Sequence, residues 1–159
     1  MKHLPKHIRP RWRYLAVEIE AAPAAEIDRT AFQRALWYAA GNLLGDAGSA
    51  DADLTVFGFT YADGIGEAIV RARREETAAA RAALACIDSV DSEPIGLVVR
   101  GISGTVRACE ESYLGDRSTH SIEEPVAFAD DQRPAIHRDD VAELSLPEGF
   151  VAATELDFH

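Results

Sequence analysis

Apolar and polar residues alternate over residues 13–20, RYLAVEIE, so that the aliphatic side chains share one side of an extended backbone. This period of two predicts a half-buried β-strand. Two further strands are predicted at 54–61, LTVFGFTY, and at 67–73, EAIVRAR, and the turn residues between them predict a hairpin. A fourth strand is predicted at 93–100, EPIGLVVR.

Apolar residues between these strands recur at helical spacing. The first helix is expected to begin at Thr30, which forms a capping-box pattern with Gln33, and to end at Gly45, where a polar loop follows. The second helix is expected in the alanine-rich segment 75–90, whose first turn carries acidic residues that suit the helix dipole. A short third helix is expected after a Gly-Ser-Gly turn, and it ends before Gly115.

The predicted order of elements is β-α-β-β-α-β, followed by an extra C-terminal helix. Such an order forms a split β-α-β sheet, antiparallel and covered by helices on one face. The sequence therefore predicts a fold of the α+β class, a ferredoxin-like or RNA-recognition-like sandwich over residues 13–115. A basic N-terminal arm, residues 1–12, precedes it. Residues 116–159 are expected to form an acidic, flexible tail, because the periodicity fades there and acidic pairs and prolines accumulate.

Charge adds information about the environment of the protein. The 159 residues include 27 acidic and 16 basic side chains, a net charge of -11, and only two of the basic residues are lysines. An acidic surface with so little lysine is typical of proteins from a salt-saturated cytosol, which indicates a halophile. The acidity then reflects the environment and does not argue against nucleic-acid binding. The basic arm, in contrast, carries no acidic residue.

Several classes of protein are excluded by simple features. Two cysteines are too few for a disulfide framework, and their spacing fits no zinc site. The chain has no apolar stretch long enough to cross a bilayer, and no apolar segment of a secretory signal precedes residue 14. We therefore expect a cytoplasmic protein that does not bind membranes.

A catalytic centre or a metal site is not expected in the chain. All five histidines lie in the arm or in the tail, whereas catalytic groups and ligands need to converge on rigid elements. The segment FGFTY, residues 57–61, has the aromatic spacing of an RNP1 box, but it lacks the preceding basic residue and glycine and belongs to the second strand instead of the third. Packing of these aromatic residues against helices or a partner is favoured, and base stacking stays open.

The arginines of the arm are better candidates for binding. Arg9, Arg11 and Arg13 are spaced by two residues, so an extended arm carries them on one side, where they suit a row of phosphates. Trp12 lies between them and can stack on a ligand. The alternative is a solvated arm without a ligand.

Another group of arginines lies at the end of the third predicted strand. Arg71 and Arg73 fall on one face of this strand, and Arg74 follows directly. These side chains can bind phosphates, or they can pair with nearby glutamates, and the sequence does not decide between the two.

The segment VVRGISGTVR, residues 98–107, is a further candidate. Its glycines allow a tight link from strand to helix, and its hydroxyl groups can cap a helix whose first N–H groups attract phosphate. An arginine in the first helical turn opposes the dipole preference, and a bound anion would explain it. A purely structural turn is the alternative, and the spacing is not that of a Walker loop. The candidate phosphate contacts are Arg100, Ser103, Thr105 and Arg107.

Four segments in this order resemble the family of archaeal ribonuclease P protein component 2. They are PKHIRPRWRYLAVEIE, the hairpin FGFTY…GEAIVRARRE, the alanine-rich helix and VVRGISGTVRACEESYL. The resemblance covers about residues 1–115, and the acidic tail resembles the extensions of haloarchaeal members.

The resemblance implies a function in tRNA maturation. Ribonuclease P removes the 5′ leader of precursor tRNA, and its RNA subunit carries the catalysis with bound magnesium. The chain itself is then a subunit without catalytic residues or a cofactor of its own. The implied partners are the ribonuclease P RNA, protein component 3, the other ribonuclease P proteins, and precursor tRNA indirectly. Self-association within a heterotetramer is also implied.

The arginines would act electrostatically, by neutralising phosphates where RNA strands crowd together. Since the Debye length is only about 3 Å at 1 M salt, bidentate hydrogen bonds and stacking by arginine should survive better than the bare charge of lysine. The alternative function is a ferredoxin-like module that binds a small molecule or has a regulatory role. It predicts a ligand-sized cavity and no basic arm.

Overall fold

The computed structural model describes residues 4–114, 122–128, 131–138, 141–146 and 149–153. The strands of the first sheet are β1 (Trp12–Ala21), β2 (Thr55–Ala62), β3 (Ile65–Arg73), β4 (Ser89–Val90) and β5 (Glu93–Ser103). The helices are α1 (Arg29–Ala52), α2 (Thr77–Ala85) and α3 (Val106–Tyr113), with short 3-10 turns η1 (Lys6–Ile8) and η2 (Arg74–Glu76).

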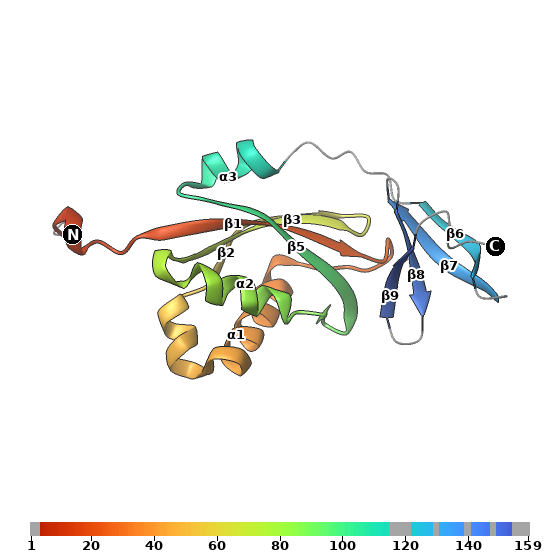
Figure 1. Ribbon diagram of the computed structural model, residues 1–159, viewed down its shortest axis with the longest axis horizontal. Coiled ribbons are helices and arrows are strands. Elements are labelled where there is room, and N and C mark those ends of the chain that lie inside the picture. The colour runs from red at the N-terminus through yellow and green to blue at the C-terminus, as the bar shows by residue number, and fades with distance from the viewer. Residues whose placement is uncertain (1–3, 115–121, 129–130, 139–140, 147–148, 154–159) are drawn as a thin grey trace.

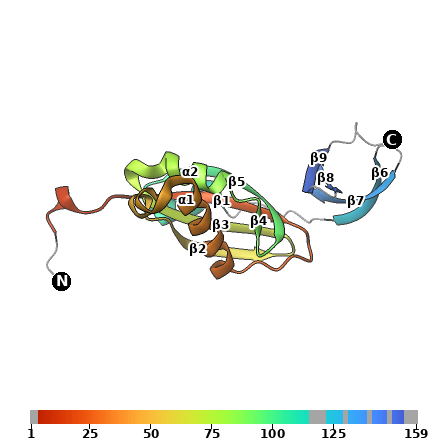
Figure 2. The same ribbon diagram turned by 90° about the horizontal axis from the view of Figure 1, so that it is seen from below.

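The sheet has the strand order β2-β3-β1-β5-β4, and β1 in its middle pairs antiparallel with both β3 and β5. Helices α1 and α2 lie side by side on one face of the sheet (Figures 1 and 2). This arrangement confirms the predicted ferredoxin-like, RNA-recognition-like fold. The four strands predicted from the sequence correspond to β1, β2, β3 and β5.

The core lies between the sheet and these two helices. Leu15, Val17 and Ile19 of β1 are fully buried there and share one cluster with Phe32 of α1 and Leu84 of α2. They share a face because successive side chains of a strand point to opposite sides. Burial of each such side chain contributes about 1.5–3 kcal/mol, so the alternation in β1 supplies much of the stability of the domain.

Helix α1 differs from the expectation at both ends. Its cap is Asp28, whose carboxylate accepts a hydrogen bond from the N–H of Ala31 at 2.7 Å. The expected capping box is therefore wrong, and the Gln33 side chain instead accepts a hydrogen bond from the N–H of Val56. Gly45 leaves the helical conformation with φ 73°, but a second helical stretch continues to Ala52, where a loop was expected.

The second helix is shorter than predicted. Helix α2 ends at Ala85, and the last residues of the segment expected to be helical, Ser89–Val90, form the small edge strand β4. This strand pairs with the beginning of β5.

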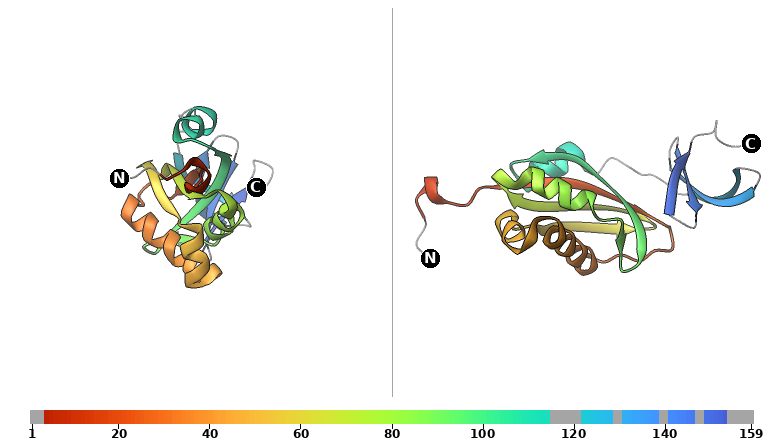
Figure 3. Two further views of the ribbon diagram at one scale, coloured as in Figure 1. Left: turned by 90° about the vertical axis from the view of Figure 1, so that its left-hand side faces the viewer. Right: turned by 60° about the horizontal axis from the view of Figure 1, so that its bottom comes forward.

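Helix α3 covers part of the other face of the sheet (Figure 3). The sequence did not predict on which face this extra helix lies. Its Cys109 is fully buried in a small cluster with Ala16 and Ile69. The expected Gly-Ser-Gly turn is wrong, because β5 continues through Gly101, which pairs with Ala16. The ring of Tyr113 lies against Gly101, where the Cβ of any other residue would overlap it. The glycine therefore serves close packing inside a strand.

A second, separate sheet follows in the acidic segment, with the strand order β6-β7-β8-β9. Its strands are β6 (Ile122–Phe128), β7 (Asp131–Arg138), β8 (Val141–Leu146) and β9 (Gly149–Ala153). This antiparallel sheet was not predicted from the sequence, whose acidic pairs and prolines indicated a flexible tail over residues 116–159. Prolines 125 and 134 argued against strands, yet they lie opposite each other in the β6–β7 register. The proposed limits of arm, domain and tail stay predictions.

We predict that Gly101→Ala loosens the docking of α3. The new methyl group displaces the Tyr113 ring, and such overpacking costs about 1–3 kcal/mol of unfolding free energy. Burial raises the pKa of the Cys109 thiol, so this thiol resists alkylation while α3 is docked. In Gly101→Ala, the unfolding midpoint should fall and alkylation of Cys109 should accelerate relative to the exposed Cys86.

Gly96→Ala is the matched control on the same strand, because its new Cβ would meet no atom within 4 Å. Equal unfolding midpoints and equal Cys109 labelling in the two variants would contradict the role of Gly101.

Candidate nucleic-acid interface

The N-terminal end of β1 lies between the C-terminal ends of β3 and β5 (Figure 1). Trp12 is paired with Arg73, and Tyr14 is paired with Arg71 on one side and with Ser103 on the other. Since β5 leads into α3, the first turn of α3 follows at the same end of the sheet. We call this region the arginine end; it comprises Trp12, Arg13, Arg71, Arg73, Arg74, Ser103, Thr105 and Arg107.

Trp12 holds two arginines of this end. The guanidinium carbon of Arg71 lies 4.0 Å from the centroid of the Trp12 ring, and that of Arg73 lies 4.3 Å from it. Cation–π contacts of this kind contribute about 0.5–2 kcal/mol, depending on their desolvation. A guanidinium that contacts a ring with its flat face keeps its N–H donors in the plane of the group, directed to its edges. The cluster can therefore present donors to an anion.

The two arginines differ in their other contacts. Arg73 forms an ion pair with Asp53 at 3.4 Å, so its partner is not one of the glutamates that the sequence suggested. Asp53 stands just after α1 with φ 48°, in the left-handed region. The Nε of Arg71 is buried and has no hydrogen-bond partner among the described residues. An unsatisfied buried donor costs free energy, so this Nε does not stabilise the fold through a hydrogen bond, and the binding capacity of Arg71 lies in the other N–H groups of its guanidinium.

Phe57 extends the cluster with an exposed aromatic ring. Its ring centroid is 5.8 Å from that of Tyr14, at an interplanar angle of 73°, and 5.9 Å from the guanidinium of Arg71. Half of the Phe57 side chain is exposed, at 50%. A register irregularity between Val56 and Gly58 directs Phe57 away from the core.

The other two aromatics of FGFTY pack as favoured from the sequence. The Phe59 ring contacts that of Phe32 at 5.8 Å, and the Tyr61 hydroxyl donates a hydrogen bond to the carbonyl of Ala25. Strict alternation would have placed all three aromatics on one face, so the irregularity is what separates Phe57 from them. A glycine inside a strand pattern is the sequence signal for such an irregularity.

The arm approaches the arginine end along its backbone. The N–H of Arg74 donates a hydrogen bond to the carbonyl of Arg11, which extends the pairing of β1 and β3 by one step. The Arg13 guanidinium donates to the carbonyl of Trp12 at 2.9 Å and lies beside Gly104. Arg9 is engaged within the arm, where its Nε donates to the carbonyl of Leu4.

The link from β5 to α3 has internal partners for its polar groups. Thr105 caps α3 by accepting a hydrogen bond from the N–H of Ala108 at 3.2 Å. The Nε of Arg107 donates to the Glu111 carboxylate, one helical turn on, at 2.7 Å. This ion pair explains the presence of an arginine in the first turn of α3 without a bound anion.

Arg100 lies apart from the arginine end. Its Nε donates to the carboxylate of Glu18 at 2.6 Å, and this hydrogen bond raises the pKa of Arg100. Glu18 is mostly buried and stands opposite Glu67 of β3 in the register. Arg100 therefore neutralises a carboxylate in the acidic half of this face, where Glu20 also contributes to its raised pKa. Phosphate contact by Arg100 stays a prediction.

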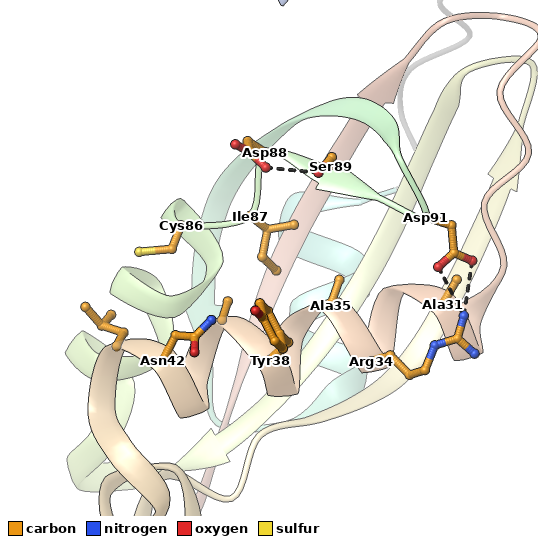
Figure 4. A pocket seen from close by; sticks show the side chains of 12 residues that line it. Ala31, Arg34, Ala35, Tyr38, Asn42, Cys86, Ile87, Asp88, Ser89 and Asp91 are labelled. Carbon is orange, nitrogen blue, oxygen red and sulfur yellow. Dashed lines mark hydrogen bonds and ion pairs between the residues drawn. The ribbon is translucent and has the colours of Figure 1, made fainter.

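The structure also contains a surface groove of about 610 Å³ between α1 and the segment after α2 (Figure 4). Its polar groups bind one another: Arg34 pairs with Asp91 at 3.1 Å, and Ser89 donates to Asp88. Within the described residues, no group of three or more His, Cys, Asp or Glu side chains could hold a metal ion. No described helix has the length and apolarity needed to span a membrane.

Together, the split β-α-β sheet and the arginine end define an RNA-recognition-like α+β domain with a cationic, aromatic surface. The chain belongs to the Rpp14/Pop5 family, whose model matches residues 13–114. Its relatives include ribonuclease P protein component 2 of Halorubrum lacusprofundi, 57% identical over 157 residues that cover 99% of both chains. The protein of the same name from Natronomonas pharaonis is 58% identical over 99% of this chain and 98% of the relative. The chain is thus a protein subunit of ribonuclease P, as its sequence resemblance implied.

The relatives differ in how much of this chain they align with. Ribonuclease P protein component 2 of Methanosarcina mazei is 33% identical over 122 residues, which are 99% of the relative but only 76% of this chain. The family model ends at residue 114, before β6. The second sheet therefore lies outside the shared family domain, in a segment that the haloarchaeal relatives also align with.

We predict that Arg100→Gln destabilises the domain by about 1–2 kcal/mol, between the values for exposed and buried ion pairs. The substitution leaves the mostly buried Glu18 facing Glu67 without the guanidinium. Thermal unfolding in molar salt measures the effect. The double variant Glu18→Gln with Arg100→Gln should recover part of the loss.

Arg107→Gln is the control, because it breaks an exposed ion pair within α3 and should cost no more than a few tenths of a kcal/mol. If the two arginine variants unfold at the same temperature, the Glu18–Arg100 pair has no special role in stability.

Proposed function

We propose that the chain binds the RNA of ribonuclease P through the arginine end, together with protein component 3, and so stabilises the catalytic part of the RNA. The observation that carries this proposal is the pair of guanidiniums held on Trp12 beside an exposed phenylalanine. Arginine edges bind phosphate oxygens in a bidentate manner, and aromatic rings accept bases. The relatives are named as protein components of ribonuclease P, and the RNA subunit is what the resemblance to that family implies.

The mechanism is electrostatic but short in range. At about 1 M salt the Debye length is about 3 Å, so only groups in direct contact with a phosphate still act on it. The Trp12 ring holds both guanidiniums in place and lowers the conformational entropy that they lose on binding. This placement lets arginine neutralise phosphates even though the chain as a whole has a net charge of -11.

The chain contributes no catalytic group in this proposal. The cleavage of the 5′ leader belongs to the RNA, which also holds the magnesium ions that the reaction needs. The arginine end would instead lower the repulsion between RNA strands around that centre. This division of labour suits a cluster made of cations and aromatic rings, which offers neither a nucleophile nor a general base.

Protein partners have a different surface available. Trp37, Tyr38 and Leu43 are large apolar residues of α1 with 54%, 75% and 47% exposure, and α1 covers the face opposite to α3. Component 3, the other ribonuclease P proteins or a second copy of this chain in a heterotetramer can bind this face while RNA occupies the arginine end. Precursor tRNA is then contacted through the RNA, in the cytoplasm.

A reconstitution tests the role as a whole. Ribonuclease P RNA and protein component 3 are combined in molar salt with magnesium, with and without this chain, and cleavage of the 5′ leader is measured. We expect the chain to raise the cleavage rate, because the folded RNA is stabilised. An unchanged rate over a range of protein concentrations would contradict the proposal.

Salt dependence tests the arginine end itself. The logarithm of RNA affinity falls linearly with the logarithm of salt concentration, and each lost phosphate contact reduces the slope by about 1. The double variant Arg71→Gln with Arg73→Gln should lower the slope by about 2 and weaken binding. The triple variant of Arg9, Arg11 and Arg13 to Gln should lower it further if the arm binds.

The double variant Arg34→Gln with Arg81→Gln is the matched control, since it removes the same charge from α1 and α2, away from the arginine end. A slope change as large as that of the arginine-end variant would mean that binding follows net charge and not this surface.

A further inference from the structure

Phe57 has a position that the fold itself does not require. The register irregularity in β2 directs its ring to the face of the sheet that carries Tyr14 and Arg71, and the ring stays 50% exposed. Its neighbours in sequence, Val56 and Phe59, belong to the core instead. The exposed ring lies beside the guanidinium of Arg71, and such a combination can accept a flat apolar group and an anion together. The position calls for a ligand that combines an apolar flat surface with negative charge.

The surroundings of the ring fit one nucleotide. Arg71 lies between the two rings, 5.9 Å from the Phe57 centroid and 4.0 Å from the Trp12 centroid, and its buried Nε has no partner among the described residues. Tyr14 meets Phe57 at an interplanar angle of 73°, and half of the Phe57 residue surface stays exposed beside this contact. The base and the phosphate of a nucleotide are joined through one sugar. A base on Phe57 therefore places a phosphate next to Arg71.

We infer that Phe57 is a stacking platform for an unpaired base of RNA, whose backbone phosphate is bound by Arg71 and Arg73. This inference rests on the proposed function and names the part of the RNA that the site accepts. An RNA duplex keeps its bases stacked inside the helix, whereas an unpaired base is free to stack on an aromatic ring. The site binds a single strand, a loop or a bulge, and with little preference for sequence, because stacking is available to every base.

Charge complementarity favours RNA over a protein at this site. Every nucleotide brings a phosphate with its base, whereas a protein segment would need an acidic residue placed next to an aromatic or aliphatic one. Two guanidiniums lie within 4.3 Å of the Trp12 centroid, so positive charge is concentrated where a nucleic-acid backbone would bring negative charge. Binding of a protein partner at Phe57 in place of RNA would therefore overturn the inference.

The test compares two RNA probes with the full-length chain in molar salt: a short unstructured single strand and a blunt duplex of the same composition. Phe57→Leu keeps an apolar side chain but removes the ring. It should weaken binding of the single strand by roughly 5-fold to 100-fold, the effect of losing one stacked base, and leave duplex binding unchanged. Phe57→Tyr should retain the wild-type affinity for both probes.

Tyr38→Leu is the matched control, because Tyr38 is an exposed aromatic residue of α1, away from this face. It should bind both probes like the wild type. As a direct measurement, a single strand carrying 5-iodouridine is irradiated on the protein, and the cross-linked peptide is identified by mass spectrometry. We expect the cross-link at Phe57.

The outcomes separate this inference from the proposed function. If Phe57→Leu binds both probes like the wild type while the variant Arg71→Gln with Arg73→Gln loses binding, RNA binding stands and the stacking platform is wrong. If Phe57→Leu weakens both probes equally, or weakens binding of component 3 instead, the inference is also wrong. If the wild-type chain binds neither probe, the proposed RNA contact fails together with it.

Discussion

The double pairing of β1 determines how the rest of the molecule is arranged. Because β1 pairs with β3 and with β5, every second side chain of this strand faces α1 and α2, and the others face α3. The buried aliphatic residues on the first side anchor the strand firmly. The strand is therefore rigid, so the side chains on its other side, among them Trp12 and Tyr14, keep fixed positions. A stable core on one face thus orders the proposed binding surface on the other.

The arginine end shows how an acidic protein can keep a cationic site. Trp12 supports two guanidiniums, and Asp53 pairs with one of them, so the cluster does not depend on long-range attraction. Contacts of this length are hardly affected by a high concentration of salt ions, whereas attraction over more than a few ångströms would be screened. In a protein from a low-salt environment, additional positive charge could attract an anion from a distance. Here the contact with Trp12 instead holds the guanidiniums in place for direct contact.

Periodicity predicted the four main strands and the fold class, because alternation and helical spacing report which side of an element is buried. The errors fall where one contact overrides the local pattern. Pairing with β1 keeps residues 101–103 in β5 where a turn was expected, and Asp28 replaces Thr30 as the helix cap. The arginines of the candidate site were proposed from their spacing, and their contact with RNA stays a prediction. Phe57 was considered together with Phe59 and Tyr61, but its separate orientation was not predicted, since it depends on an irregularity in strand register. The second sheet was missed because prolines and acidic pairs hid its pattern.

The face of the sheet that carries α3 is electrically polarised along β1. Arginines gather at Trp12, whereas Glu18 and Glu67 stand opposite each other further along the same strand. Glu18 lies six positions after Trp12 on β1, which corresponds to about 20 Å at about 3.3 Å per residue. An RNA strand that continued along β1 would meet Glu67 and the Glu18–Arg100 ion pair over this short distance. If RNA binds as proposed, its footprint on this face would be limited to a few nucleotides, and the strand would leave the sheet sideways or past the N-terminal arm.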